Sequence, residues 1–387
     1  MTVRRAYLDY NASAPLLPAA RAAMLAALDL DANPSSVHID GRAARKTVDV
    51  ARRAVAALVN AKPEHVVFTS GATEAATTLL SPDWMMGRAP VRMARLVVCA
   101  TDHPCILGGG RFPKDAVDVV GVDRNGIVDL VALEAMLQAH DRDDGLVMVA
   151  LHAANNETGV IQPIAEIARL VKAHGGVLVV DAVQAAGRIP IDITDGYGDF
   201  LILSSHKIGG PMGVGAIVGT SDLMMPAPLI RGGGQEKGHR AGTENLPGIA
   251  GFGAAARAAH AGLGDTPGLA GVRDHLERSL LTMAPDAMIF GQSVERLCNT
   301  SFFAVPGLKA ETAQIAFDLA GVSLSAGSAC SSGKVGPSHV LKAMGVGDGT
   351  GALRVSIGRD TGEDDIAAFE RALSAHLARR AVGSEAA

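Results

Sequence analysis

The chain has 387 residues, of which 48% are hydrophobic and 19% charged, a composition typical of a globular protein with a large core. This length predicts two lobes. The net charge of −5 gives no reason to expect a nucleic acid or an anionic membrane as partner, and no apolar run approaches the roughly 20 residues of a membrane span. The N-terminus resembles neither a signal peptide nor an amphipathic leader, so we expect a cytoplasmic protein.

Helical and strand patterns alternate along most of the chain. Apolar spacings of three and four predict amphipathic helices over residues 17–28 and 43–59. Short apolar runs without period-two alternation predict strands that are buried on both faces. These runs cover residues 66–68, 96–99, 116–120, 146–151, 177–180 and 200–203. Together the patterns predict an α/β fold with a mostly parallel central sheet flanked by helices.

The pattern changes after Gly264. Helices are predicted over 272–281, 310–319 and 364–377, with shorter strands at 301–304 and 353–357. This arrangement predicts a smaller α+β domain. A cluster of turn-forming residues at 264–268 marks the boundary, so we expect a large domain over 15–263 and a small one formed by 1–14 and 264–387.

The four cysteines, at positions 99, 105, 298 and 330, include no C-x-x-C pair, so we expect neither a metal site nor a disulfide scaffold. Cys99 ends an apolar run and Cys298 precedes one, which predicts that both are buried as small hydrophobic side chains. Cys105 allows either interpretation. Cys330 lies in a run of Ser, Ala and Gly near Lys334, the exposed setting that a nucleophilic thiolate requires.

Ligands of open α/β sheets bind at the carboxyl ends of the strands. The sequence Ser70-Gly71-Ala72-Thr73 ends one strand and begins a helix, so its free N–H groups and the Thr73 hydroxyl favour a phosphate; a simple helix cap is the alternative. Asp181 ends the run 177–180. A carboxylate there needs a partner, either a structural ion pair or the pyridinium nitrogen of pyridoxal phosphate.

Lys207 and His103 also follow predicted strands. A buried lysine loses its charge readily and can then condense with a carbonyl to form a Schiff base, although Lys207 taken alone is also an ordinary loop lysine. His103 would place a flat imidazole against a planar ligand, or serve the fold only. A phosphate seat, an aspartate and a later lysine, in this order at strand ends, describe a pyridoxal phosphate enzyme.

Three further segments allow a site or a structural role. Asn155 and Asn156 could act as fixed amide donors or form a turn. The glycine-rich loop 232–245, which carries Thr243, could bind a phosphate here or across a subunit interface, or be solvated. Arg354 interrupts a predicted strand and could bind a substrate carboxylate through two hydrogen bonds, or form a buried ion pair.

These residues resemble the cysteine desulfurases of the nitrogen-fixation and iron–sulfur-assembly type, within the class-V aminotransferases of fold-type I pyridoxal phosphate enzymes. The resemblance runs nearly end to end. Its motifs, in fixed order, are LDYNA (8–12), NPSSVH (33–38), TSGATE (69–74), NNETG (155–159), DAVQ (181–184), SHK (205–207), RAGT (240–243) and SAC (328–330).

The resemblance implies pyridoxal 5'-phosphate as cofactor and a role for each site residue. Lys207 would form the Schiff base, Asp181 would pair with the ring nitrogen, and His103 would stack on the ring. The residues implied near the phenolic oxygen are Asn156 and Gln184, and those around the phosphate are Ala72, Thr73, Ser204 and His206, joined by Thr243 from the partner subunit of a homodimer. Arg354, with Asn11 and Asn156, would bind the substrate carboxylate.

The resemblance further implies that Cys330 attacks the sulfur of L-cysteine, leaving alanine and a Cys330 persulfide for an iron–sulfur scaffold or a sulfur-carrier protein. No resident metal is implied; the persulfide would at most ligate a cluster transiently, shared with a scaffold. The loop from Cys330 to Pro337 resembles the long form, which suits direct delivery.

Departures from the family pattern are Ser13-Ala14, Ala76-Thr77, Gly209 and Met212, and none of them removes a catalytic group. A selenocysteine lyase or aminotransferase, and a non-catalytic sulfur carrier that retains the fold, are the alternatives.

Overall fold

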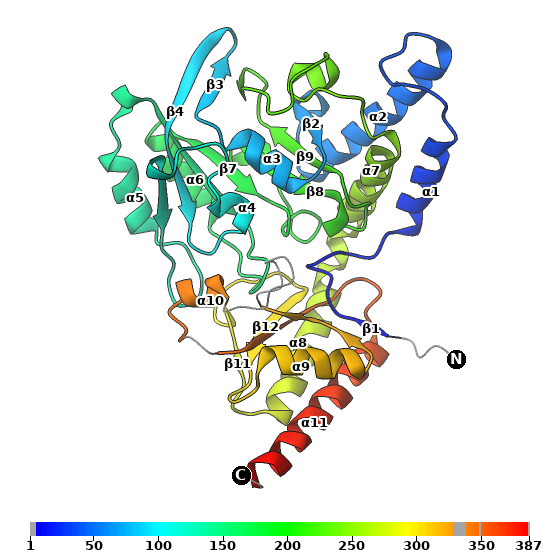
Figure 1. The fold of residues 1–387 in the computed structure, drawn as a ribbon, viewed down its shortest axis with the longest axis vertical. Helices are drawn as coiled ribbons and strands as arrows, with labels where there is room; N and C mark the ends of the chain where they lie inside the picture. The colour runs from blue at the N-terminus through cyan, green and yellow to red at the C-terminus, as the bar shows by residue number, and fades with distance from the viewer. Residues whose placement is uncertain (1–4, 328–337, 348–349, 386–387) are drawn as a thin grey trace.

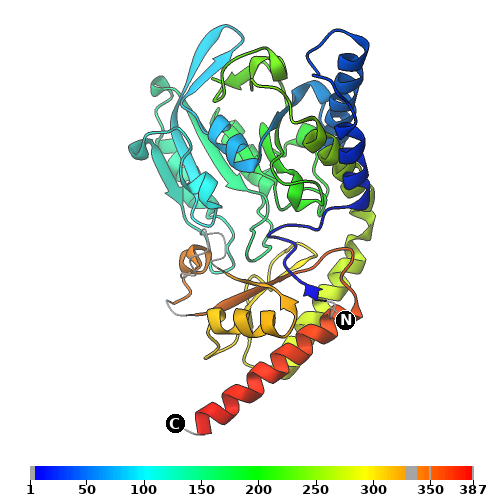
Figure 2. The same ribbon diagram turned by 45° about the vertical axis from the view of Figure 1, so that its right-hand side comes forward.

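The computed structural model describes residues 5–327, 338–347 and 350–385, with side chains up to residue 378. Figures 1 and 2 show a larger upper lobe and a smaller lower lobe. A nine-stranded sheet forms the centre of the upper lobe, and a four-stranded sheet forms the centre of the lower one.

The large sheet has the strand order β10-β3-β4-β6-β7-β8-β9-β2, with β5 also paired to β4. Its central pairs, from β5–β4 through β7–β8, are parallel, and the pairs toward both edges are antiparallel. The strands are β2 (Val66–Thr69), β3 (Asp83–Met86), β4 (Ala89–Cys99), β5 (Val117–Val120), β6 (Leu146–His152), β7 (Val177–Asp181), β8 (Phe200–Ser204), β9 (Gly215–Gly219) and β10 (Met224–Pro226). The predicted α/β fold with a mostly parallel centre is confirmed.

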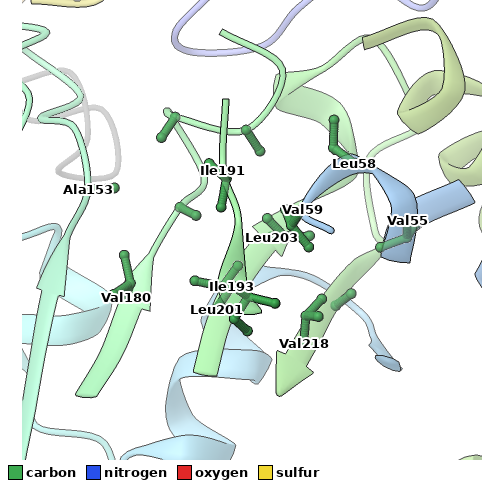
Figure 3. Close-up of a cluster of buried hydrophobic side chains, with 14 of the residues drawn as sticks. Val55, Leu58, Val59, Ala153, Val180, Ile191, Ile193, Leu201, Leu203 and Val218 are labelled. Carbon is green, nitrogen blue, oxygen red and sulfur yellow. The ribbon is translucent and has the colours of Figure 1, made fainter. Parts of the chain in front are cut away.

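Both faces of this sheet are covered, which explains the unbroken apolar runs. In β6, Val147, Val149 and Leu151 join one core cluster while Met148 and Ala150 join the other. Figure 3 shows part of the first cluster, in which Val55 and Leu58 of helix α2 lie beside Leu203 of β8 and Val218 of β9, and Val180 of β7 lies farther along the sheet. Each large aliphatic side chain buried there contributes about 1.5–3 kcal/mol.

The helices of the upper lobe divide between the two faces. The first face is covered by α2 (Ile39–Leu58), α5 (Leu130–Ala139), α6 (Ile164–Ala173) and α7 (Leu246–Ala261), with α1 (Pro18–Leu28) packed on α7. The second face carries α3 (Ala72–Leu79) and the short α4 (Pro104–Leu107).

Residues 83–99 differ from the prediction of a single strand at 96–99. Strand β4 begins at Ala89 and pairs with β3 in a hairpin that extends beyond the rest of the sheet (Figure 1), with Gly87 at positive φ in its turn. Trp84 of the hairpin is buried, 5.1 Å from Phe200 between ring centroids. The outer half of β4 is mostly exposed, and Pro90 and Arg92 interrupt its apolar residues, so no continuous apolar run marks it.

The lower lobe contains the antiparallel sheet β11-β12-β15-β14. Its elements are α8 (Thr266–Met283), β11 (Met288–Ile289), β12 (Thr300–Ala304), α9 (Ala310–Leu319), β13 (Val322–Ser323), β14 (Ser325–Ala326), α10 (His339–Ala343), β15 (Ala352–Ser356) and α11 (Glu363–Glu385). The N-terminal β1 (Ala6–Tyr7) pairs with β13, and Asp9 bridges Ser356, so the first residues of the described chain lie with this lobe.

The connection between the lobes differs from the predicted turn at 264–268. A 3-10 turn over Gly262–Asp265 joins α7 to α8, so the backbone stays nearly helical from one lobe to the other (Figure 2). Pro267 lies in the first turn of α8, where a missing N–H breaks no helical hydrogen bond. The Pro-Gly cluster therefore begins a helix. In the part of the chain that the structure describes, no helix is long and apolar enough to cross a bilayer.

The cysteines are buried to different degrees. Cys99 is buried, as predicted, and Cys105 is half-buried. The prediction that Cys298 is buried is wrong: it is half-buried and faces a second cavity of about 410 Å³ that also contacts Arg188. Cys330, with the rest of the loop through Pro337, lies outside the described residues.

Candidate active site

A cavity of about 460 Å³ opens where β6, β7 and β8 end. It is bounded by the last residues of these strands, His152, Asp181 and Ser204. Asp181 and Ser204 are predicted site residues, and the further predicted ones that line the cavity are Asn11, Ala72, Thr73, His103, Asn156, Gln184, His206 and Lys207. The fold therefore brings most of the predicted site together; Thr243 and Arg354 do not line the cavity.

Lys207 ends a 3-10 turn that follows β8 directly. Its Nζ donates hydrogen bonds to the backbone oxygens of Asn11, at 2.5 Å, and Ala12, at 2.9 Å. Gly209 follows at φ +83°, and a Cβ there would lie 2.6 Å from Cγ of Leu17. Leu17 therefore occupies the space that a side chain at position 209, where this chain departs from the family pattern, would need.

The phosphate seat predicted at Ser70–Thr73 lies between β2 and α3. Gly71 precedes the helix and makes no side-chain cap, while Glu74 reaches back so that its Oε2 accepts from the Ser70 N–H at 2.8 Å. The turn lies close against β9, since a Cβ on Gly215 would approach the Gly71 carbonyl carbon to 2.6 Å. The helix start therefore presents its free N–H groups to the cavity, as an anion site requires.

Asp181 is almost fully buried at the end of β7. The Val183 N–H donates to its Oδ1 at 3.0 Å, and no ion pair to it is found among the described residues. Burial, only partly offset by the Val183 hydrogen bond and the neighbouring His152, raises the pKa of Asp181 to about 6. A cation in the cavity would compensate this carboxylate.

His152 is a cavity residue that the sequence reasoning missed. Its Nδ1 lies 2.6 Å from Oδ1 of the buried Asp102, and its Nε2 lies 3.3 Å from Nε2 of Gln162. Because Gln162 Oε1 accepts from the Val128 N–H, its amide nitrogen faces His152 as a donor, which assigns the proton to Nδ1 of the imidazole. The signal was present: His152 directly follows the apolar run 146–151.

The two predicted histidines lie near Lys207 and are neutral. Burial, followed by the charges of Lys207 and His339, lowers the pKa of His103 to about 4. Burial and Lys207 likewise lower the pKa of His206 to about 4. His103 Nδ1 accepts from the Cys105 N–H at 3.2 Å, so Cys105, which also lines the cavity, fixes the ring position.

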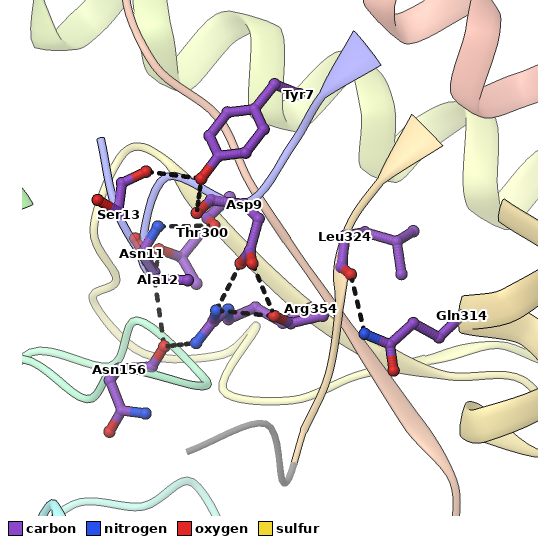
Figure 4. Close-up of polar contacts among 12 residues, drawn as sticks. Tyr7, Asp9, Asn11, Ala12, Ser13, Asn156, Thr300, Gln314, Leu324 and Arg354 are labelled. Carbon is purple, nitrogen blue, oxygen red and sulfur yellow. Dashed lines mark hydrogen bonds and ion pairs between the residues drawn. The ribbon is translucent and has the colours of Figure 1, made fainter. Parts of the chain in front are cut away.

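Arg354 lies in a buried cluster beside the cavity (Figure 4). Its Nη2 donates to Asp9 Oδ1 at 2.6 Å, and its Nη1 donates to the Asn156 backbone oxygen at 2.9 Å. Within the described residues, its buried Nε has no hydrogen-bond partner. The ion pair that was the structural alternative is therefore present, and binding of a substrate carboxylate stays a prediction.

Asn11 connects this cluster to Lys207. Its Nδ2 donates to Thr300 Oγ1 at 2.9 Å and to the Asn156 oxygen at 3.2 Å, and its Oδ1 accepts from Asn299 at 3.0 Å. Its backbone oxygen accepts from Lys207 and Gln184. The side chain thus joins the lobes, and its predicted contact with substrate stays a prediction.

Thr243 is exposed and lies in the loop after the 3-10 turn Gln235–Gly238. Its position away from the cavity of its own chain agrees with the implied contact in a partner subunit, which stays a prediction.

These residues fit pyridoxal 5'-phosphate. A lysine at the cavity wall suits the aldehyde, the start of α3 suits the phosphate, and the uncompensated Asp181 suits a ring nitrogen that carries a proton.

Comparison with known proteins gives the same assignment. The family model for aminotransferase class-V matches residues 6–369. A cysteine desulfurase of Cereibacter sphaeroides is 39% identical, covering 92% of this chain and 91% of the relative, and one of Frankia sp. is 38% identical, covering 93% and 88%.

Solved structures are similar over nearly the whole chain. A NifS-like protein from Rickettsia africae has a TM-score of 0.85 at 31% identity, covering 96% of this chain and 98% of its own. SspA, solved in complex with cysteine, has a TM-score of 0.72 at 26% identity, covering 91% and 98%. This chain belongs to the class-V aminotransferase family of pyridoxal phosphate-dependent enzymes.

Proposed function

We propose that this chain is an L-cysteine desulfurase that releases alanine and passes sulfur, as a Cys330 persulfide, to an acceptor protein. The observation that carries the proposal is the convergence of Lys207, Asp181 and the start of α3 on one cavity. Relatives that are 38–39% identical along most of the chain are named cysteine desulfurases, and the similar SspA binds cysteine.

The reaction balances without an external oxidant or reductant. The Cys330 thiol and L-cysteine give a Cys330 persulfide and alanine: the substrate C–S bond breaks, an S–S bond forms, and a proton ends on the alanine methyl group. The bound pyridoxal phosphate supplies the electron sink that permits cleavage of the bond to sulfur.

The residues of the chain bind the substrate and carry protons. Lys207, held by the Asn11 and Ala12 oxygens, anchors the cofactor and moves protons at the substrate carbons. His103 is neutral, so it covers the ring without opposing a positive charge in the cavity. The unpaired Nε–H of Arg354 supports its role in binding the substrate carboxylate.

A homodimer is part of the proposal. Glu244, next to Thr243, is buried, and neither of its carboxylate oxygens finds a hydrogen bond in the described structure; Arg45 lies 3.8 Å away. Leu25 and Leu28 of α1 are more than half exposed. A second copy would cover such groups and would bring Thr243 to the phosphate.

The remaining assignments keep the predictions made from the sequence. We propose the domain division of 15–263 against 1–14 with 264–387, a cytoplasmic location, and an iron–sulfur scaffold or sulfur carrier as acceptor.

The test uses purified holoenzyme with cysteine and a reductant. The Cys330→Ala variant should keep the yellow colour of the bound cofactor and lose sulfide and alanine release, while Cys298→Ala, the matched control, keeps both. Normal desulfuration by Cys330→Ala excludes the persulfide step. A keto acid as product in place of alanine would identify an aminotransferase.

A further inference from the structure

The glycine-rich loop 232–245 contains a buried carboxylate. Within residues 231–240, all of them described, Glu236 is the one buried side chain. Arg52 donates to it twice, from Nη1 to Oε2 and from Nη2 to Oε1, each at 2.7 Å. The Phe68 N–H also donates to Oε2 at 2.9 Å. Glu236 is therefore held by helix α2 and by strand β2.

The backbone is strained at this point. Glu236 has φ 47° and ψ 41°, and Lys237 has φ 56° and ψ 23°, so two successive residues with side chains adopt the left-handed conformation. Such conformations persist only where the surroundings fix them, and they concentrate at functional sites. At Glu236, the surroundings that fix this conformation are the hydrogen bonds from Arg52 and the Phe68 N–H.

Arg52 is itself fixed to β2. Its Nη1 donates to the Val66 oxygen at 2.5 Å, and its guanidinium lies 4.9 Å from the centre of the Phe68 ring. Strand β2 continues directly into Ser70–Thr73, the phosphate seat. The Glu236–Arg52 pair thus joins the loop to the strand that leads into this seat.

The same loop contacts the helix that leaves the seat. Arg240 Nε donates to Glu74 Oε1 at 3.0 Å, while Glu74 Oε2 accepts from the Ser70 N–H. Burial alone would raise the pKa of Glu74, but the hydrogen bonds from Arg240 and Ser70 outweigh it and lower that pKa. Two charged contacts, at Glu236 and at Arg240, therefore fix the loop relative to the phosphate seat before Thr243 is reached.

We propose that Glu236, through Arg52, is a positioning residue for phosphate recognition, because it fixes the loop that presents Thr243. The inference rests on the proposed role of Thr243 in a homodimer. A pair that only stabilised the fold would affect all ligands alike, whereas a positioning residue for this loop affects the phosphate group selectively.

The test compares pyridoxal phosphate with pyridoxal, which lacks the phosphate. Dissociation constants are measured with the full-length protein after hydroxylamine has released the cofactor from Lys207 and dialysis has removed it. In Glu236→Gln, binding of pyridoxal phosphate should weaken about tenfold or more, as expected for loss of a charge-assisted hydrogen bond, while pyridoxal binding changes less than about twofold. Equal weakening of both ligands, or no change in either, overturns the proposal.

The lower lobe offers a matched control. Glu277 receives Arg296 Nη1 at 2.8 Å and Nη2 at 3.0 Å, with both side chains under a tenth exposed. Glu277→Gln removes the same charge from an equally buried pair and should leave the ratio of the two dissociation constants unchanged. A selective loss of phosphate affinity in this control also contradicts the proposal.

A milder variant keeps the test decisive if Glu236→Gln fails to fold. Arg52→Lys keeps the positive charge but cannot bind both oxygens of Glu236, so the same selective loss is expected. Failure of the wild-type holoenzyme to release alanine from cysteine would instead refute the proposed function, and the ratio of dissociation constants remains a separate result.

Discussion

Two buried polar clusters border the cavity, and they differ in how their charges are paired. On the upper-lobe side, Asp181 is buried without an ion pair in the described structure and its pKa is raised. On the lower-lobe side, Arg354 is bound to Asp9, Asn156 and Ser325. A buried charge is costly unless compensated, so the first cluster requires a ligand whereas the second largely completes itself.

This difference in charge pairing predicts that substitutions in the two clusters affect different properties, the reaction in one and the stability of the fold in the other. Asp181 gains its counter-charge only when a cofactor binds, so its substitution should act on the reaction. Arg354 has its counter-charge from Asp9, a residue of the N-terminal segment that lies with the lower lobe, so its substitution should act first on stability.

The largest effect is expected at Asp181. In Asp181→Asn, turnover should fall roughly 10²–10³-fold, the range for removing one preorganised electrostatic partner from a reaction centre. The matched control is Asp199→Asn. Asp199 precedes β8 at the other end of the same strand pair, where its Oδ2 accepts from the Leu178 N–H at 2.8 Å. Alanine release should stay within about threefold of wild type there, because no ligand faces Asp199; similar losses in both variants would break the comparison.

Arg354→Gln should show the next largest effect, a destabilisation of up to about 3 kcal/mol, the lower end of the range for breaking a buried pair, because it leaves the partly buried Asp9 carboxylate without its partner. Denaturant unfolding of the holoenzyme measures it. The double variant Arg354→Gln/Asp9→Asn should recover part of this loss, since no unpaired charge remains. If single and double variants unfold at the same denaturant concentration, the ion pair does not carry the stability. A raised KM for cysteine in the single variant would support the proposed role of Arg354 in binding the substrate carboxylate.

Glu157 tests, through the pH dependence of stability, whether a buried carboxyl group without an ion pair is costly to ionise. It is buried and accepts from Ser338 Oγ at 2.6 Å; burial, only partly offset by Ser338 and Arg354, raises its pKa to about 7. The native state therefore holds a proton that the unfolded chain loses near pH 4.5. Stability falls as pH rises from about 4.5 to 7, by at most about 3 kcal/mol.

Glu157→Gln cannot ionise and should lack this decline. Unfolding midpoints of wild type and variant at pH 5 and pH 8 give the difference, in which other titrating groups cancel. Parallel pH profiles of the two proteins would show that Glu157 is already charged at pH 5.

The strand ends explain how much of the site the sequence could predict. Asp181 and Lys207 were predictable because each follows a fully apolar run, and such a run ends at the ligand-binding edge of a parallel sheet. His152 follows an equally clear run but was missed, because nothing in the chain near it shows its partner Asp102, 50 residues away. Glu236 and Arg52 are 184 residues apart, and a charged residue in a glycine-rich loop gives no sign of burial.

The strands could be predicted from the sequence where both faces of the sheet are covered by other elements. The central strands β6, β7 and β8 lie between two core clusters, so every residue before the last one of each strand is apolar and the run is visible in the sequence. The hairpin β3–β4 has one exposed end, so its sequence lacks an unbroken apolar run. The residue types at the start of α8, around Pro267, are those that also form turns, so the sequence alone did not distinguish the two. In both places, contacts with residues distant in the sequence determine the structure, and the local sequence pattern does not.

The smallest effect is expected at Arg95, whose geometry resembles that of the buried pairs. Its Nε lies 3.0 Å and its Nη2 2.5 Å from the two carboxylate oxygens of Asp118, but the side chains are 39% and 37% exposed. Water already solvates both charges, so Arg95→Gln should cost no more than about 1 kcal/mol, and the difference should vanish in 1 M salt. Both arginines bind one carboxylate, so the difference in stability loss between Arg95→Gln and Arg354→Gln measures the effect of burial on the pair. A loss at Arg95 as large as that at Arg354 would mean that hydrogen-bond geometry, and not burial, sets the cost of breaking an arginine–aspartate pair in this protein.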